Sequence, residues 1–201
     1  EKRGLRVTGS ELVGLIPLKA MIAAADYYLE KQQRSLGIAE SEKIKIAVKS
    51  LGLDDLKPFN PQEKIIEYVL AKDADKKLID LSLTDFADIT ASESVAPGGG
   101  SIAAYAGALG AALGTMVANL SSHKAGWDDK WKYYSDWAEK GEVYKNKLLF
   151  LVDEDTNAFG KIIDGFRMPK GTELEKALRK QAIEDATKYA TEIPYQVMET
   201  A

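Results

Sequence analysis

An aspartate set among apolar residues is the first feature of this sequence whose position suits chemistry. Six residues recur at spacings of four and three, the pattern of one face of an α-helix: Leu148, Val152, Asp155, Phe159, Ile162 and Phe166. Asp155 is the only polar member of this stripe. A carboxyl group on a core-facing stripe loses contact with water, which raises its pKa and suits it to proton transfer near neutral pH. The alternative is structural: a carboxylate that is satisfied by a hydrogen bond or fixes helix register.

A glycine-rich loop is the second such feature. Gly98, Gly99 and Gly100 precede Ser101, which can cap a following helix. Free N–H groups at a helix N-terminus bind anions or polar ligand groups. The loop is not a Walker A motif, because no Lys-Ser or Lys-Thr follows, and it is not a dinucleotide-binding motif, because no predicted strand precedes it. The alternative is a flexible hinge.

Other reactive side chains are few. The chain has one histidine and no cysteine, which excludes disulfides, thiol catalysis and a multi-histidine metal site within it. His123 is a candidate general base, although a single histidine in a polar loop is more often simply exposed. The three tryptophans (Trp127, Trp131 and Trp137) either stack on a flat ligand ring or anchor packing. The formal net charge is −4 with Lys and Arg spread along the chain, so no nucleic-acid-binding surface is predicted.

Helices are predicted on both sides of the glycine loop. Residues 102–120 contain no charged residue. Their length reaches that of a membrane span, but their Ala, Gly and polar content favours a helix buried in protein, so no membrane partner is expected. Gly107, Gly110 and Gly114 share one face. This is either a core helix of a bundle or one of a tight helix pair, within the chain or across a subunit boundary.

The C-terminal half is predicted to be helical throughout. Residues 128–166 form a long amphipathic helix, either continuous or interrupted near Gly141. Thr172 and Glu175 form a capping box that opens a last helix, which Pro194 should bend or end.

The first 70 residues have mixed signals. Residues 5–15 predict a strand and a turn, and helices are predicted over residues 18–32 and 41–50 and from Asn60 to about Leu70. The polar, charged residues that follow suggest a linker over 71–78, between a domain at 1–70 and a helical domain at 79–201. The chain begins at Glu1 without a secretory signal pattern, so a cytoplasmic fragment of a longer protein is expected.

Several ordered motifs resemble the formiminotransferase-cyclodeaminase family. Residues 7–17 (VTGSELVGLIP), with 51–54, 58–59 and 65–68, are similar to the closing part of the formiminotransferase domain. Residues 94–101 (SVAPGGGS), 151–159 (LVDEDTNAF) and 168–170 (MPK) are similar to the opening part of the cyclodeaminase domain. Together they cover nearly the whole chain, which makes the resemblance more specific than any single motif.

The resemblance implies a mainly α fold: an antiparallel helical cyclodeaminase domain, incomplete at its C-terminus, after a small α/β remnant of the transferase domain. It implies a homo-oligomeric enzyme of folate metabolism and histidine degradation. The transferase moves a formimidoyl group onto tetrahydrofolate, and the cyclodeaminase closes the product to 5,10-methenyltetrahydrofolate with release of ammonia. No metal or redox cofactor is expected beyond the folate substrate. The alternatives are a methenyltetrahydrofolate cyclohydrolase of the same fold and a non-catalytic oligomerisation module.

Site residues carry over by position. Asp155 matches the aspartate expected to transfer protons, and Asp153 is the reserve candidate. Residues 98–101 would hold polar edges of the folate, and Lys170 either pairs with a glutamate carboxylate of the substrate or is solvated in its turn. The part of the transferase domain in which the family keeps its catalytic histidine is missing from this chain, so His123 is not assigned that role.

Overall fold

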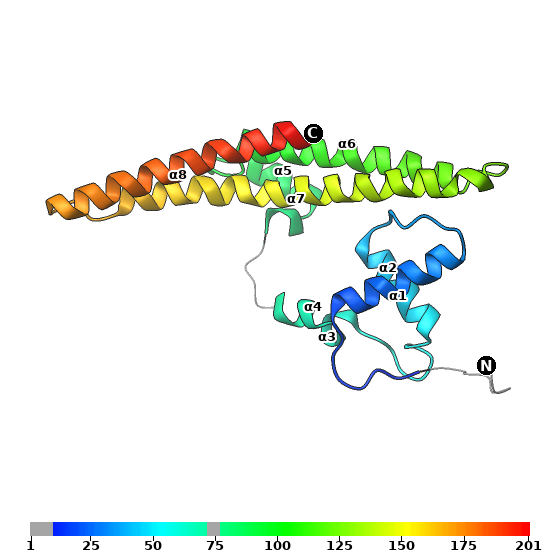
Figure 1. The fold of residues 1–201 in the computed structure, drawn as a ribbon. Helices are drawn as coiled ribbons and strands as arrows, with labels where there is room; N and C mark the ends of the chain where they lie inside the picture. The colour runs from blue at the N-terminus through cyan, green and yellow to red at the C-terminus, as the bar shows by residue number, and fades with distance from the viewer. Residues whose placement is uncertain (1–9, 72–76) are drawn as a thin grey trace. The chain divides into compact units, whose positions relative to one another are not determined.

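The computed structural model describes residues 10–71 and 77–201, which belong to two compact units (Figure 1). The first unit comprises residues 1–75 and 115–142, and the second comprises residues 76–114 and 143–201. Helices make up nearly all of the regular structure described, which confirms the predicted mainly α class. The strand predicted around Leu5 and Val7 lies outside the described residues and stays a prediction. Residues 72–76 of the predicted linker also lie outside them, so the domain boundary stays a prediction too.

Helices of the first 71 residues share one core in the first unit. They are α1 (Leu18–Lys31), α2 (Glu40–Leu51), α3 (Pro61–Lys64) and α4 (Ile66–Ala71). The predictions for α1 and α2 are confirmed. Their apolar faces bury Met21, Ala25, Ile44 and Ala47 together with Ile65. Gly52 ends α2 with a φ of 65°, a left-handed conformation that glycine adopts without steric cost.

The single helix predicted from Asn60 to Leu70 is wrong, because Ile65 interrupts it. Asn60 does cap the first turn: its Oδ1 accepts a hydrogen bond from the Gln62 amide at 3.1 Å. Ile65 then turns extended and forms an isolated parallel bridge with Ile16. Among residues 10–71 no strand is formed beyond this bridge.

Long helices dominate the second unit. It contains a short 3-10 turn η1 (Leu78–Asp80), α5 (Leu83–Ala91), the first part of α6 (Gly99–Ser122), most of α7 (Trp131–Arg167) and α8 (Glu173–Thr200). Figure 1 shows α7 and α8 side by side, joined by a short turn. The core gathers small side chains of α6, larger ones of α7 and two of α8: Ala104, Ala108, Leu148, Leu151, Val152, Ile193 and Val197.

The start of α8 follows the predicted cap, whereas its end differs from the prediction. Thr172 and Glu175 form the predicted capping box: the Glu175 amide donates to Thr172 Oγ1 at 3.2 Å, and the Thr172 amide donates to Glu175 Oε2 at 2.8 Å. α7 runs without a break through Gly141. Pro194 was expected to bend or end the last helix; α8 continues through it to Thr200, so the helix does not end there, and the bend stays a prediction.

α6 packs through its smallest side chains. Its buried positions recur at helical spacing and are all Ala, Ser or Thr: Ser101, Ala104, Ala108, Thr115, Ala118 and Ser122. Of the three glycines predicted to form a packing face, Gly107 lies against Leu148, but Gly110 and Gly114 have no atom near the position of a Cβ. By length and composition α6 is apolar enough to cross a membrane, and 28% of its most apolar stretch of 18 residues is buried.

Leu148 tests this core. It is 1% exposed, and Leu148→Ala should lower the free energy of unfolding by about 2–5 kcal/mol, because the cavity adds to the lost transfer free energy. Chemical denaturation measures the change. The matched control is Leu174→Ala, at a position 70% exposed, which should stay within about 0.5 kcal/mol of the unsubstituted protein. Equal losses for the two variants would contradict the packing described.

Candidate functional site

The Asp155 carboxylate of α7 lies against the N-terminus of α6. Its Oδ2 accepts a hydrogen bond from the Ser101 amide at 2.9 Å and from Ser101 Oγ at 3.1 Å. The first amides of a helix lack intrahelical acceptors and carry a partial positive charge. The carboxylate therefore satisfies one of these amides and neutralises part of the helix dipole.

Ser101 is held inside this contact. Its side chain is fully buried, and its Oγ also lies 2.9 Å from the Val152 carbonyl oxygen and 3.4 Å from Thr156 Oγ1. It was predicted to bind substrate. The structure instead directs its hydroxyl toward α7, where it positions Asp155.

Two of the three predicted loop glycines lie close to Asp155. A Cβ built on Gly100 would overlap the carboxylate, with Asp155 Cγ at 2.6 Å, and one on Gly98 would lie 3.8 Å from Oδ2. At Gly99 the same position is open. Gly100 is therefore required by a close approach: any side chain there would push the carboxylate away from Ser101.

Three polar groups beside this contact have no hydrogen-bond partner among the described residues. The hydrogen bonds of Asp155 within the described part of the chain all use Oδ2, which leaves Oδ1 without a donor. The Gly99 and Gly100 amides, at the start of α6, have no acceptor among the described residues. Asp155 itself is half-buried. Ser101 thus holds the carboxylate through Oδ2, while Oδ1 lies next to Gly100, and the amides of Gly99 and Gly100 have no acceptor among the described residues.

The apolar stripe of α7 that contains Asp155, and from which its role was predicted, is only partly buried. Leu148 and Val152 are in the core, but Phe159 is 39% and Phe166 is 55% exposed. The buried line shifts to Ala158 and Gly165, and a Cβ on Gly165 would meet Ile183 of α8 at 3.0 Å. The inward orientation predicted for both phenylalanines is therefore wrong in this chain.

Asp153, the reserve candidate, has a different role. Its Oδ1 accepts a hydrogen bond from the Leu78 amide at 2.6 Å, so it fixes the segment that leads into η1. Its Oδ2 is shielded from solvent and has no hydrogen-bond partner in the described residues. Burial raises the pKa of this carboxyl above its usual range, although the Leu78 amide and the charge of Lys77 oppose the shift. As it stands, no substrate reaches Oδ2.

Lys170 is not brought to Asp155. It is exposed in the turn that precedes α8, beyond the end of α7 at Arg167. Twelve residues of α-helix separate Asp155 from Arg167, a rise of about 18 Å. Lys170 can therefore meet only the distal end of a long ligand.

The remaining candidates lie in the first unit. His123 is largely exposed. Its pKa is lowered, mainly because part of the ring is shielded from water and to a lesser extent because the positive charge of Arg34 is nearby. Trp127 stacks on Tyr134 with ring centroids 5.4 Å apart, and Lys124 lies over the Trp127 ring at 4.1 Å. The ring of Trp127 is thus already in contact with Tyr134 and Lys124 of the same chain. Trp137, by contrast, is 51% exposed.

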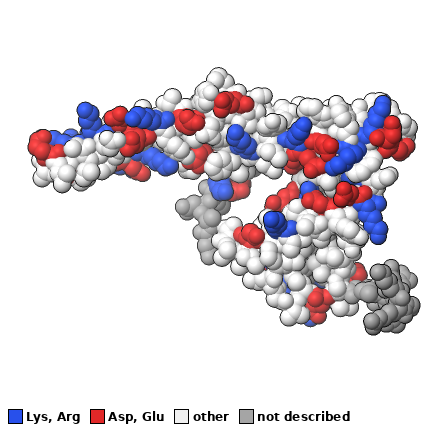
Figure 2. All heavy atoms as spheres, in the orientation of Figure 1, with Lys and Arg blue, Asp and Glu red and all other residues white. Residues whose placement is uncertain are grey.

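A groove between α7 and α8 was not predicted from the sequence. It measures about 450 Å³, and its lining includes Lys161, Asp164, Gly165, Met168, Ala186 and Tyr189. Lys161 lies 4.0 Å from the centre of the Tyr189 ring, and the Tyr189 hydroxyl donates to Glu154. On the face drawn in Figure 2, basic and acidic side chains alternate along the long helices, so no surface of single charge appears there.

Two family models match the chain in succession. The model described as "Formiminotransferase domain" matches residues 1–71, and "Formiminotransferase-cyclodeaminase" matches residues 82–201. Curated relatives include the formimidoyltransferase-cyclodeaminase of Gallus gallus, 40% identical over 94% of this chain and 35% of its own length, and that of Mus musculus, 36% identical over 100% and 37%. The chain thus spans about a third of the length of these relatives.

Two further matches concern the helical part. The methenyltetrahydrofolate cyclohydrolase of Methylorubrum extorquens is 36% identical over 56% of this chain and 54% of its own length. The crystal structure of a formiminotetrahydrofolate cyclodeaminase from Thermotoga maritima superposes with a TM-score of 0.52 at 31% identity, covering 62% of this chain and 58% of that one.

Asp153 makes stability depend on pH. Its folded-state pKa is raised, so its contribution to stability is complete below the unfolded value of about 3.9 and is lost as pH rises through the folded pKa. Asp153→Asn removes this loss. The free energy of unfolding of the variant, relative to that of the unsubstituted protein, should rise as the pH increases from about 4 through the raised folded-state pKa. Denaturant titration at each pH measures it. Asp164→Asn, at an exposed carboxylate of the same helix, is the control, and parallel profiles for Asp153→Asn and the unsubstituted protein would contradict the burial described.

Proposed function

The chain belongs to the formiminotransferase-cyclodeaminase family, and from that premise we propose that its helical part cyclises 5-formimidoyltetrahydrofolate to 5,10-methenyltetrahydrofolate with release of ammonia. In the longer relatives this part is joined to a transferase, so the transfer of the formimidoyl group is proposed for the whole protein. The observation that carries the proposal is the Asp155 carboxylate fixed beside free amides of the glycine loop.

The reaction needs a group that moves protons between two nitrogens. N10 of the folate attacks the carbon of the formimidoyl group, which enters the reaction in its protonated, positively charged form, and forms a new C–N bond. The C–N bond to the terminal nitrogen then breaks, and its electron pair leaves with that nitrogen as ammonia. The proton of N10 passes to a carboxylate, which returns a proton to the departing nitrogen. Nothing is oxidised or reduced, so the step requires no redox cofactor, and we propose none.

Asp155 suits this role better than Asp153. Oδ1 of Asp155 has no hydrogen-bond donor within the described residues and adjoins the open loop, whereas Oδ2 of Asp153 is shielded from solvent. Ser101 holds the other oxygen of Asp155, which keeps the carboxylate in one orientation as proton transfer requires. We assign Asp155 as the acid–base residue, Ser101 as its positioning residue, and the Gly98–Gly100 backbone as the part that meets polar edges of the folate.

Two finer assignments complete the proposal. Lys170, beyond the end of α7, would meet a carboxylate at the glutamate end of the folate. A cytoplasmic location fits the cysteine-free composition.

A cyclohydrolase is the second candidate function. The Methylorubrum extorquens relative carries that name, and hydrolysis of the methenyl bridge needs the same carboxylate to activate water. Adding methenyltetrahydrofolate to the protein separates the two: loss of methenyl absorbance faster than the spontaneous rate favours the cyclohydrolase. Formation of methenyl absorbance with ammonia from 5-formimidoyltetrahydrofolate favours the cyclodeaminase.

Self-association through α6 is proposed as well. The outer face of this helix exposes large apolar side chains by half or more of their surface: Leu109, Leu113, Met116, Val117 and Leu120. A contiguous apolar surface of this kind is typical of an interface. A non-catalytic helical oligomerisation module would use the same face, and the ammonia assay distinguishes that module from an enzyme.

Asp155→Asn tests the catalytic assignment. The amide keeps the shape of the side chain but does not shuttle a proton, so kcat should fall by about 10²–10⁴-fold. Methenyl absorbance and ammonia release measure turnover. Asp153→Asn is the matched control, because that residue holds the Leu78 backbone, and it should keep most of the activity. Full turnover by Asp155→Asn would remove the assignment, and an unsubstituted protein that releases no ammonia would contradict the proposed activity.

Gly110→Leu tests the interface. No atom of the described residues lies within 4 Å of a Cβ built on Gly110, so we expect a leucine there to disturb packing mainly against another copy. The molar mass measured by light scattering should fall toward that of a smaller assembly. Gly160→Leu, at an equally open position on α7, should leave the mass unchanged. An unaltered assembly in Gly110→Leu would exclude this face as the interface.

A further inference from the structure

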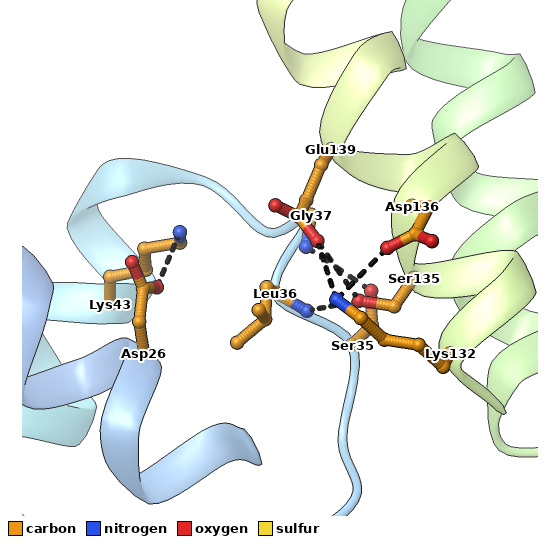
Figure 3. Close-up of polar contacts among 9 residues, drawn as sticks. All are labelled: Asp26, Ser35, Leu36, Gly37, Lys43, Lys132, Ser135, Asp136 and Glu139. Atoms are coloured by element: carbon orange, nitrogen blue, oxygen red, sulfur yellow. Dashed lines mark hydrogen bonds and ion pairs between the residues drawn. The ribbon is translucent and has the colours of Figure 1, made fainter.

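The loop between α1 and α2, residues 32–39, packs against the helices α6 and α7 within the first compact unit. Figure 3 shows Leu36 and Gly37 of this loop facing Ser135 and Glu139 of α7. The loop belongs to the segment that matches the transferase domain, and the two helices belong to the segment that matches the cyclodeaminase. The contact therefore joins two segments that different family models describe.

Gly37 fits this contact because it has no side chain. A Cβ there would overlap the Ala138 carbonyl carbon and the Glu139 nitrogen of α7. Gly37 is not one of the glycines with positive φ, so the requirement comes from the close approach of two backbones. Gly37 and Ala138 are both buried. Loop and helix thus touch backbone to backbone at this point.

Side chains of both helices satisfy the buried loop backbone. Asn119 of α6 donates its Nδ2 to the Gly37 carbonyl oxygen at 2.7 Å, and Ser135 of α7 accepts from the Leu36 amide at 3.0 Å. Ser35, 1% exposed, accepts from the Gly37 amide at 3.2 Å. A buried backbone group without a partner is costly, so the bonds to Asn119 and Ser135 favour the docked position, whereas the bond to Ser35 lies within the loop.

α6 and α7 also approach each other closely in this stretch, where a Cβ on Gly141 of α7 would overlap Thr115 Oγ1 of α6. Their buried residues between 115 and 142 are Thr115, Ala118, Ser122, Ser135 and Ala138, and such small side chains bury little apolar area. The ion pairs of Lys132 with Asp136 at 2.9 Å and Glu139 at 3.8 Å are half-exposed, so they add little. The α1–α2 loop therefore covers a stretch of the helix pair whose buried side chains are small.

We propose that residues 35–37 are a docking element through which the transferase-matching segment stabilises the α6–α7 pair at residues 115–142. The docked loop and this stretch of the helix pair then open and close together. The compact unit itself crosses the family boundary, because residues 115–142 cluster with residues 1–75. α6 and α7 also carry Ser101 and Asp155, so this contact bears on the helices that build the candidate site.

Hydrogen exchange of the Gly37→Ala variant tests the proposal. The added methyl group separates the loop from α7, and the amides of residues 119–122 and 135–139 should exchange on the order of tenfold faster. Amides of the α1 core around Met21 and Ala25 should keep their protection, because that packing is unchanged. The matched control, Gly160→Ala, lies at an open helical position and should leave exchange at 135–139 unaltered.

Asn119→Ala keeps the test decisive if Gly37→Ala does not fold. It removes only the hydrogen bond to the Gly37 carbonyl, and exchange at residues 135–139 should rise by about fivefold. Unchanged protection of α7 in a folded Gly37→Ala, or in Asn119→Ala, would overturn the proposal. Loss of protection in α1 and α7 alike in Asn119→Ala would also overturn it, because the bond would then serve the whole unit rather than the docking contact.

Discussion

A carboxylate at a helix N-terminus holds the candidate site together. The Ser101 amide at the start of α6 lies inside the protein and needs an acceptor, and Asp155 of α7 provides it. The contact has two requirements: Gly100 must lack a side chain, and Ser101 must be buried, where it also reaches the Val152 carbonyl. Because the bond joins residues 54 positions apart in the sequence, it sets the register of α6 relative to α7.

The sequence predicted those parts of the fold that are decided locally. Caps and apolar periodicity located α1, α2 and the start of α8, because capping bonds span only a few residues. It failed where a distant contact decides. Ile65 leaves its helix to pair with Ile16, on the far side of α1 and α2 in the sequence. Pro194 stays within α8 because Ile193 and Val197 on either side are buried at 2% and 6% exposure, and their burial offsets the lost helical bond.

The candidate site divides in the same way. Apolar spacing singled out Asp155 and glycine content singled out the loop, and the structure places the two in contact. The sequence could not show that Ser101 points at Asp155, because the residues that surround it come from another helix. Asp153 lies outside the apolar stripe, yet the segment around Leu78 folds over it and partly buries it. Periodicity describes one helix, whereas burial depends on what packs against it.

The structural and catalytic interpretations of Asp155 are compatible because they use different oxygens. Oδ2 accepts from Ser101, while Oδ1 has no donor among the described residues. In the proposed reaction the proton is taken up and returned at Oδ1, so the bond that anchors α6 need not break during turnover. A carboxylate that had to rotate between steps would lose the orientation on which proton transfer depends. The hydrogen bond that once argued for a purely structural role is therefore what keeps the reactive oxygen beside the glycine amides.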